Sequence, residues 1–327
     1  MMANKYLTWL TEQTDTAYWS DSAVLLEIDT AALNGATGVT TNPVLICGAL
    51  RDHPEQWAAM PEQKNCDRAE ELTRYITKAI AEKPGVGFCC AQIDPNKPGD
   101  EKAMLEQALR YSKIADNIVI KVPATKAGLR VYEECAARGF NVAATVSFTV
   151  AQVLCAAEAF ERGCRRAEAQ GIKPGFGIAV LMSGRLDDYL RDVAKDRNSS
   201  ATEEDIRQCG LAAVKRAYGI FIERGYKCKL MSAAGRGPYH ITELSGADMI
   251  LSLTPKIAET VSGLSGPFET RIDIPIPAVT IKRLSEMTEF IKAYEPDGLS
   301  PEEFIAYGAT NRTLAQFCLT GWDPMRF

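Results

Sequence analysis

Short runs of apolar and β-branched residues recur along this chain, and each is followed by a stretch with the spacing of an amphipathic helix. Eight such runs predict strands, at residues 18–21, 37–41, 86–93, 117–122, 141–148, 177–183, 227–233 and 248–253. Some of them, such as NIVIKV at 117–122, are apolar at nearly every position, which is typical of parallel strands buried on both faces. This alternation of strand and helix predicts parallel βα units.

The intervening helices carry start and stop signals. Thr202 and Asp205 have the spacing of a capping box, and Gly225 suits the end of the helix that would begin there. Ser300 followed by Pro301 predicts another helix start, because a proline in the first turn of a helix loses no hydrogen bond.

Eight βα units favour a closed (β/α)₈ TIM barrel over the alternative of an open, doubly wound sheet. No Gly-x-Gly-x-x-Gly follows the first predicted strand, so a dinucleotide-binding sheet has no support. We therefore expect a single domain over residues 1–327, with the barrel at about 18–265 and a C-terminal helical extension at about 266–327.

The composition limits which binding partners and which cellular compartment are expected. The net charge is −5, and no cluster of Lys and Arg predicts binding to nucleic acid or to a membrane. No signal peptide and no apolar stretch of spanning length is evident. Ten cysteines without a CxxC pair predict reduced thiols in the cytoplasm, and with only two histidines we expect no metal site.

In a barrel, chemistry belongs at the carboxyl ends of the strands. Lys121 is the most informative residue there, because it interrupts an apolar strand in which an unpaired ammonium is costly to desolvate. Desolvation favours a neutral amine, the form that attacks a carbonyl group. A lysine in a buried ion pair, or one that reaches out at the barrel rim, is the alternative.

Five segments lie in the order and at the spacing found in one known family. They are GVTTNPVLI at 38–46, IKVPATKAG at 120–128, NVAATVSFTVAQ at 141–152, SGRLDDYL at 183–190 and SAAGR at 232–236. With these motifs the chain resembles the transaldolases, and most of all a long bacterial branch with a C-terminal extension, here GATNRTLAQF at 308–317. The resemblance implies a (β/α)₈ barrel that acts on sugar phosphates through a lysine Schiff base and needs no cofactor.

Carried over position by position, the resemblance makes Lys121 the nucleophile and requires a first-strand aspartate as general acid and base. Asp15, Asp21 and Asp29 are the candidates. Asp15 leaves too much chain before the second-strand motif and Asp29 leaves too little for a helix, so we choose Asp21, which lies 21 residues before Asn42. Asn42 is expected to hydrogen-bond the donor near the imine; otherwise it is an ordinary turn residue.

The resemblance also assigns a catalytic water and a neighbouring aromatic position. Gln92 stands where transaldolases usually carry glutamate and where the related aldolases carry glutamine, unless the alignment slips to Cys89. Thr145 matches the threonine that holds this water. Phe148 stands where those aldolases are expected to carry tyrosine.

Two arginines are assigned to the substrate phosphate. Arg185 and Arg236 match the family's phosphate-binding arginines, and two planar guanidinium groups suit a dianion. Ser183 lies in the same loop as Arg185, with a weaker claim to the substrate. His240, near Arg236, has no clear counterpart role in the family, and a contact with the substrate is left open.

Three positions depart from the family pattern, and each has lost a polar side chain. They are Ala143, Val180 and Ala234. A substrate hydroxyl at such a position would lack a partner, so the preferred sugar can differ from the usual one.

The sequence thus predicts a transaldolase that transfers a dihydroxyacetone unit between sugar phosphates, either alone or as a homo-oligomer. A lyase of the same family, which releases free dihydroxyacetone or cleaves a related ketose, is the first alternative; Gln92 favours it, whereas Phe148 favours transfer. A barrel that binds sugar phosphates without catalysis is the second alternative.

Overall fold

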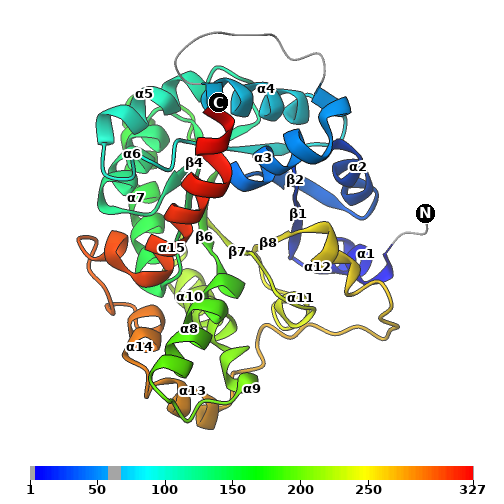
Figure 1. Ribbon diagram of the computed structural model, residues 1–327, viewed down its shortest axis with the longest axis vertical. Coiled ribbons are helices and arrows are strands. Elements are labelled where there is room, and N and C mark those ends of the chain that lie inside the picture. The colour runs from blue at the N-terminus through cyan, green and yellow to red at the C-terminus, as the bar shows by residue number, and fades with distance from the viewer. Residues whose placement is uncertain (1–3, 58–67, 327) are drawn as a thin grey trace.

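The computed structural model describes residues 4–57 and 68–326, and its centre is a closed barrel of eight strands (Figure 1). Each strand pairs in parallel with the next one along the chain, and β8 pairs with β1. The strands are β1 (Ala17–Asp21), β2 (Ala36–Thr40), β3 (Phe88–Gln92), β4 (Ile118–Pro123), β5 (Asn141–Thr145), β6 (Gly177–Leu181), β7 (Lys229–Ala233) and β8 (Ile250–Leu253). The (β/α)₈ barrel is confirmed, and the open sheet is excluded.

Helices cover the outside of the barrel and follow most strands (Figure 1). Those that precede or follow the strands are α1 (Lys5–Gln13), α2 (Leu25–Leu33), α3 (Pro43–Asp52), the short η1 (Pro54–Trp57), α4 (Arg68–Ala81), α5 (Glu101–Tyr111), α6 (Lys126–Ala137), α7 (Val150–Ala169), α8 (Ser183–Asp196), α9 (Glu203–Ile206), α10 (Cys209–Arg224), α11 (Tyr239–Thr242) and α12 (Pro255–Glu259). Within the two described ranges, no helix has both the length and the apolar character that crossing a bilayer requires.

The inside of the barrel is filled at its amino end by stacked aromatic rings. The Trp19 ring lies 5.8 Å from that of Phe88, which in turn lies 5.0 Å from the ring of Phe176. Gly38 makes room for this stack, because a Cβ atom there would come within 2.4 Å of the Trp19 ring. In a barrel of this kind, the side chains that carry chemistry belong at the opposite, carboxyl end of the strands.

The helix expected between Thr202 and Gly225 is two helices instead, α9 and α10. The capping box at Thr202 and Asp205 forms, and Gly225 ends α10 in the left-handed conformation, with φ 61°. The interruption has a tertiary cause: the backbone N–H of Gly210 donates to Asp187 Oδ1 at 2.7 Å, so a side chain of α8 caps the start of α10.

The extension consists of α13 (Ala278–Leu284), α14 (Thr288–Tyr294), η2 (Phe304–Ala306), α15 (Gly308–Phe317), the π-helical turn η3 (Cys318–Trp322) and η4 (Asp323–Arg326). The start expected at Ser300 leads only to turns and to the 3₁₀ turn η2. Phe304 and Tyr307 are both buried there, and residues three apart share one side of a 3₁₀ turn.

The end of this extension packs against α3 and α4 and reaches the loop after β3 (red in Figure 1). Gly321 lies against the first turn of α3, where a Cβ atom would come within 2.7 Å of Pro43. Arg326 reaches Asp94, just after β3, with an Nη2–Oδ2 distance of 3.2 Å. The segment therefore forms part of the surroundings of the strand ends.

Candidate active site

Lys121 lies on the inner face of β4, paired in register with Gln92 of β3 and with Ala143 of β5. Its side chain is 6% exposed, and its Nζ donates to the carbonyl oxygen of Thr41 at 3.2 Å. Among the residues that the structure describes, no carboxylate forms a salt bridge with Lys121. The buried ion pair that the sequence left open is therefore not formed, and the amine remains available for chemistry.

Asp21 ends β1 and is partly buried close to Lys121. Burial raises the pKa of Asp21, while the charge of Lys121 and the hydrogen bond from Thr40 lower it. Thr40 Oγ1 donates to Asp21 Oδ1 at 2.8 Å and lies 2.6 Å from Ser252 Oγ, so the carboxyl group is held in place from β2 and β8. A carboxyl group whose pKa is raised by burial takes up a proton more readily than an exposed one, which suits a general acid and base.

The two other aspartates considered for this role lie elsewhere. Asp29 is on α2 and forms a salt bridge of 2.9 Å with Lys83. Asp15 lines a cavity at the amino ends of the strands, together with Phe88 and Asp248. The structure thus brings only Asp21 of these three to the neighbourhood of Lys121.

Gln92 and Thr145 each have one buried side-chain oxygen atom to which no described residue forms a hydrogen bond. Gln92 Oε1 and Thr145 Oγ1 are both buried and have no hydrogen-bond partner among residues 4–57 and 68–326. A buried polar atom left unpaired costs on the order of 1–3 kcal/mol, so these two are the atoms that a bound water or hydroxyl would satisfy. Their positions are compatible with the water-binding role that the sequence suggested for them.

The strand that carries Thr145 ends there rather than at Phe148, as the sequence had suggested. Val146 has a φ of 54°, in the left-handed region, where a β-branched residue is strained by roughly 1–3 kcal/mol. Phe148 is wholly buried, and its backbone N–H donates to Gln152 Oε1 at 2.9 Å. Gln152 also donates from Nε2 to the carbonyl of Ala124 at 3.2 Å, so it ties the loop after β4 to the loop after β5.

Asn42 is the N-cap of α3, with its Oδ1 accepting from the N–H groups of Val44 at 3.0 Å and Leu45 at 3.2 Å. The side-chain oxygen of Asn42 therefore caps the start of α3. Its Nδ2 makes no hydrogen bond to any residue within the described ranges, so the amide group could still donate to a ligand. Both interpretations of Asn42 are compatible with this geometry.

Arg185 lies in the first turn of α8 and contacts the C-terminal extension. Its Nη1 donates to Gln316 Oε1 at 2.5 Å, and its guanidinium lies 5.4 Å from the centre of the Phe317 ring. Burial and the nearby charge of Arg236 lower the pKa of Arg185, and Asp21 raises it. No sequence signal connected Gln316 to this site, because the contact spans 131 residues.

Arg236 follows β7 and is exposed. Its guanidinium forms a salt bridge of 2.8 Å with Asp188 and donates from Nη1 to the carbonyl of Ala234 at 2.8 Å. The loop lies very close to α8: a Cβ atom on Gly184 would come within 2.2 Å of the Ala234 oxygen. The structure therefore brings Arg185 and Arg236 to one place.

Ser183 is wholly buried between two strand ends. Its Oγ lies 2.9 Å from Ser232 Oγ and 3.3 Å from the carbonyl oxygen of Ala233, so it joins the end of β6 to β7. These contacts are structural, and a contact between Ser183 and substrate stays a prediction.

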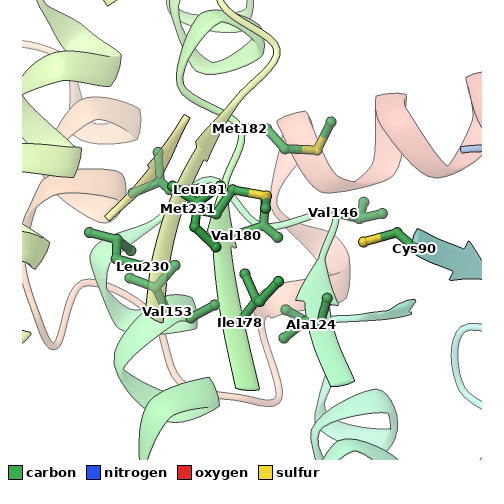
Figure 2. Packing of buried hydrophobic residues seen from close by; sticks show 14 of the residues in the cluster. Cys90, Ala124, Val146, Val153, Ile178, Val180, Leu181, Met182, Leu230 and Met231 are labelled. Carbon is green, nitrogen blue, oxygen red and sulfur yellow. The ribbon is translucent and has the colours of Figure 1, made fainter. Parts of the chain in front are cut away.

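The inner wall on the β5–β7 side is apolar. Ala143, Val180 and Met231 are buried, and Val180 pairs with Met231 in register. Figure 2 shows these two side chains on neighbouring strands, with Cys90 and Val146 pointing toward one another. Burial raises the pKa of Cys90 to about 12, so its thiol stays protonated and adds no charge.

Comparison with known proteins adds to this geometry. A family model described as "Transaldolase/Fructose-6-phosphate aldolase" matches residues 18–298. Over an alignment of 297 residues, the chain is 26% identical to a protein of Alteromonas mediterranea named transaldolase. The alignment covers 85% of this chain and 86% of that relative. Over 252 residues, the chain is 25% identical to a protein of Pseudoalteromonas atlantica named transaldolase, and that alignment covers 71% of this chain and 73% of the relative. The family match includes Lys121, Asp21 and both arginines and ends before Gln316.

Proposed function

Because this chain belongs to the transaldolase/fructose-6-phosphate aldolase family and is thus a transaldolase-type enzyme, we propose that Lys121 carries its Schiff base. The observation that supports this most is the position of Lys121, a buried amine without a carboxylate partner in the described part of the chain. The reaction proposed is the transfer of a dihydroxyacetone unit from a ketose phosphate to an aldehyde acceptor.

In this reaction the amine of Lys121 attacks the carbonyl carbon of the ketose, and loss of water gives an imine. The Asp21 carboxylate takes the proton from the hydroxyl on the fourth carbon, the bond between the third and fourth carbons breaks, and its electron pair moves toward the imine nitrogen. An aldehyde leaves, and the enamine that remains adds to the carbonyl of a second aldehyde. Asp21 returns its proton to the new alkoxide, and water then releases the product from Lys121.

The phosphate of the sugar would lie between Arg185 and Arg236. Their mutual repulsion, which contributes to the lowered pKa of Arg185, would be relieved by a dianion. Asp188 neutralises Arg236 in the ligand-free protein, so a phosphate would have to compete with that salt bridge. The first turn of α8 adds the positive end of a helix dipole to this region.

Transfer is preferred to release of free dihydroxyacetone. Release requires a proton on carbon and then attack by water on the imine, and neither Gln92 nor Phe148 has a group that acts as a base. We also propose that the reaction belongs to the pentose phosphate pathway in the cytoplasm, a location supported by the nine described cysteines, all of which are free thiols.

Two measurements test the function. Fructose 6-phosphate and borohydride should add a three-carbon mass to the peptide that contains Lys121, and Lys121→Met should abolish this adduct. Lys126→Met is the matched control, because Lys126 is about half exposed and its Nζ lies 2.6 Å from Glu302 Oε1, away from the barrel interior. An adduct on Lys126, or none with any ketose, would contradict the Schiff base on Lys121.

The second measurement separates transfer from release. Fructose 6-phosphate is supplied with and without erythrose 4-phosphate, and both the new ketose phosphate and free dihydroxyacetone are quantified. We expect transfer to be the faster process. Release without acceptor that is as fast as transfer with it would favour the lyase.

A further inference from the structure

Between α8, α10 and the loop after β7 lies a buried polar pair that no step of the proposed reaction uses. Asp187 is 0% exposed and His240 is 1% exposed, and Asp187 Oδ2 lies 3.3 Å from His240 Nε2. Asp187 Oδ1 accepts the backbone N–H of Gly210 at 2.7 Å. Burial raises the pKa of Asp187, while the contact with His240 lowers it. Such a buried pair is costly to desolvate. The groups that it holds in place therefore indicate its role.

The pair is connected to Arg236 through the backbone. The N–H of Arg236 donates to His240 Nδ1 at 3.1 Å. An imidazole nitrogen accepts a hydrogen bond only when it carries no proton, so this contact places a ring proton on Nε2. Nε2 lies 3.3 Å from Asp187 Oδ2 and has no aligned hydrogen-bond partner in the described part of the chain. The nearby Asp187 carboxylate favours the one tautomer in which His240 can hold Arg236.

The loop that carries Arg236 needs such a contact. Ala234 adopts the left-handed conformation with φ 62°, and Pro238 beyond the arginine is exposed. The Arg236 side chain is held by Asp188, the sequence neighbour of Asp187 on α8. One helix thus holds both parts of the arginine, the side chain directly and the backbone through His240. If a phosphate takes the guanidinium away from Asp188, the backbone hydrogen bond to His240 still holds this residue.

We propose that His240 is a positioning residue for substrate phosphate, and that it fixes the backbone of Arg236 while the guanidinium is exchanged from Asp188 to the phosphate. This inference rests on the phosphate-binding role of Arg236 in the proposed function. His240 itself does not touch the substrate. Its contribution is a lower entropic cost of placing Arg236 when the phosphate binds.

Two substitutions separate the two nitrogen atoms of His240. His240→Asn places an acceptor near the position of Nδ1 and so keeps the contact with the Arg236 N–H. His240→Gln places a donor near Nε2 and keeps the contact with Asp187, but it leaves the Arg236 N–H without its partner. We expect His240→Gln to raise KM for fructose 6-phosphate by roughly three- to tenfold, as for the loss of one hydrogen bond, and His240→Asn to raise it less than twofold.

Unphosphorylated fructose gives the discriminating comparison, because its KM should be unchanged in both variants. Tyr239→Phe is the control: it removes the hydroxyl that lies 3.4 Å from Asp187 Oδ2 and leaves the contact between His240 and Arg236 intact. Its KM values should match those of the parent protein. Equal losses on both sugars, or a lowered melting temperature with no change in the ratio of the two KM values, would overturn the positioning role.

Calorimetric titration with inorganic phosphate tests the same inference without catalysis. The parent protein and His240→Asn should bind phosphate with similar Kd, and His240→Gln should bind several-fold more weakly. Equal Kd for all three proteins would overturn the inference even if the enzyme is a transaldolase. If no ketose forms an adduct on Lys121 but the titration shows the expected order, the proposed reaction fails and the role of His240 stands.

Discussion

At the carboxyl end of the barrel, the inner wall differs in polarity between the two sides of Lys121. The strands β8, β1, β2 and β3 contribute polar side chains, namely Ser252, Asp21, Thr40 and Gln92. The strands β5, β6 and β7 contribute apolar side chains apart from Thr145, namely Ala143, Val180 and Met231. We refer to these two sets as the polar half and the apolar half.

The difference bears on the ketone that Lys121 would bind. A ketone attached to this amine has two arms, and the arm that is cleaved must face Asp21, the base, in the polar half. The other arm then faces the apolar half, where a hydroxyl group would be buried without a partner. Such a loss of hydrogen bonds is costly, so the dihydroxyacetone unit proposed above should be bound less tightly than an otherwise identical unit whose second arm is apolar.

The largest effect is expected in the polar half, from Asp21→Asn. Positioned acids and bases typically contribute about 10²–10⁴-fold, and kcat should fall by that factor while borohydride still traps some imine. Asp29→Asn is the control and should be nearly neutral, because Asp29 pairs with Lys83 on the outside of the barrel. If Asp29→Asn were the inactive variant, the polar half would not contain the base.

A smaller effect is expected in the apolar half. Hydroxyacetone has a methyl group in place of one hydroxymethyl arm, and the parent protein should form its trapped adduct more readily than that of dihydroxyacetone. Val180→Thr adds a hydroxyl at nearly the same shape and should shift this preference toward dihydroxyacetone by roughly tenfold. Val180→Ala, which adds no hydroxyl, should not shift it. Should the parent protein prefer dihydroxyacetone, Gln92 or Thr145 rather than the apolar half would face the second arm.

The smallest effect concerns the pH dependence within the polar half. Thr40 lowers the pKa of Asp21 by its hydrogen bond, so Thr40→Val should raise that pKa further. Activity needs the deprotonated carboxylate, and it is lost as the pH falls through the pKa of Asp21. The acidic limb of the kcat profile should therefore move to higher pH. Ser252→Ala keeps the bond between Thr40 and Asp21 and should move the limb less; an unmoved limb in Thr40→Val would remove Thr40 from this role.

Much of the barrel could be predicted from the sequence because a strand buried on both faces is a continuous apolar run. All eight strands lie within a few residues of their expected positions. The ends were harder to predict: β5 stops at Thr145 because Val146 turns into the left-handed region, and nothing about a valine signals that conformation. The break between α9 and α10 depends on Asp187, a residue of another helix.

In the candidate site, too, some features could be predicted from the sequence and others depend on tertiary packing. The motifs around Lys121, Asp21 and the two arginines indicated which side chains gather, since barrel topology brings strand ends together. The contact of Arg185 with Gln316, and that of His240 with the backbone of Arg236, depend on tertiary packing that no local pattern encodes. Phe148 is wholly buried, and its place beside the donor stays a prediction.

The position of the C-terminal extension has a consequence for the order in which the protein is made. Residues 308–326 leave the ribosome after all eight strands. The strands can pair before this segment exists, but Arg185 receives Gln316 and Phe317, and the start of α3 receives Gly321, only once the segment docks. The surroundings of the arginine are therefore complete only after the last segment of the chain has been made and has docked.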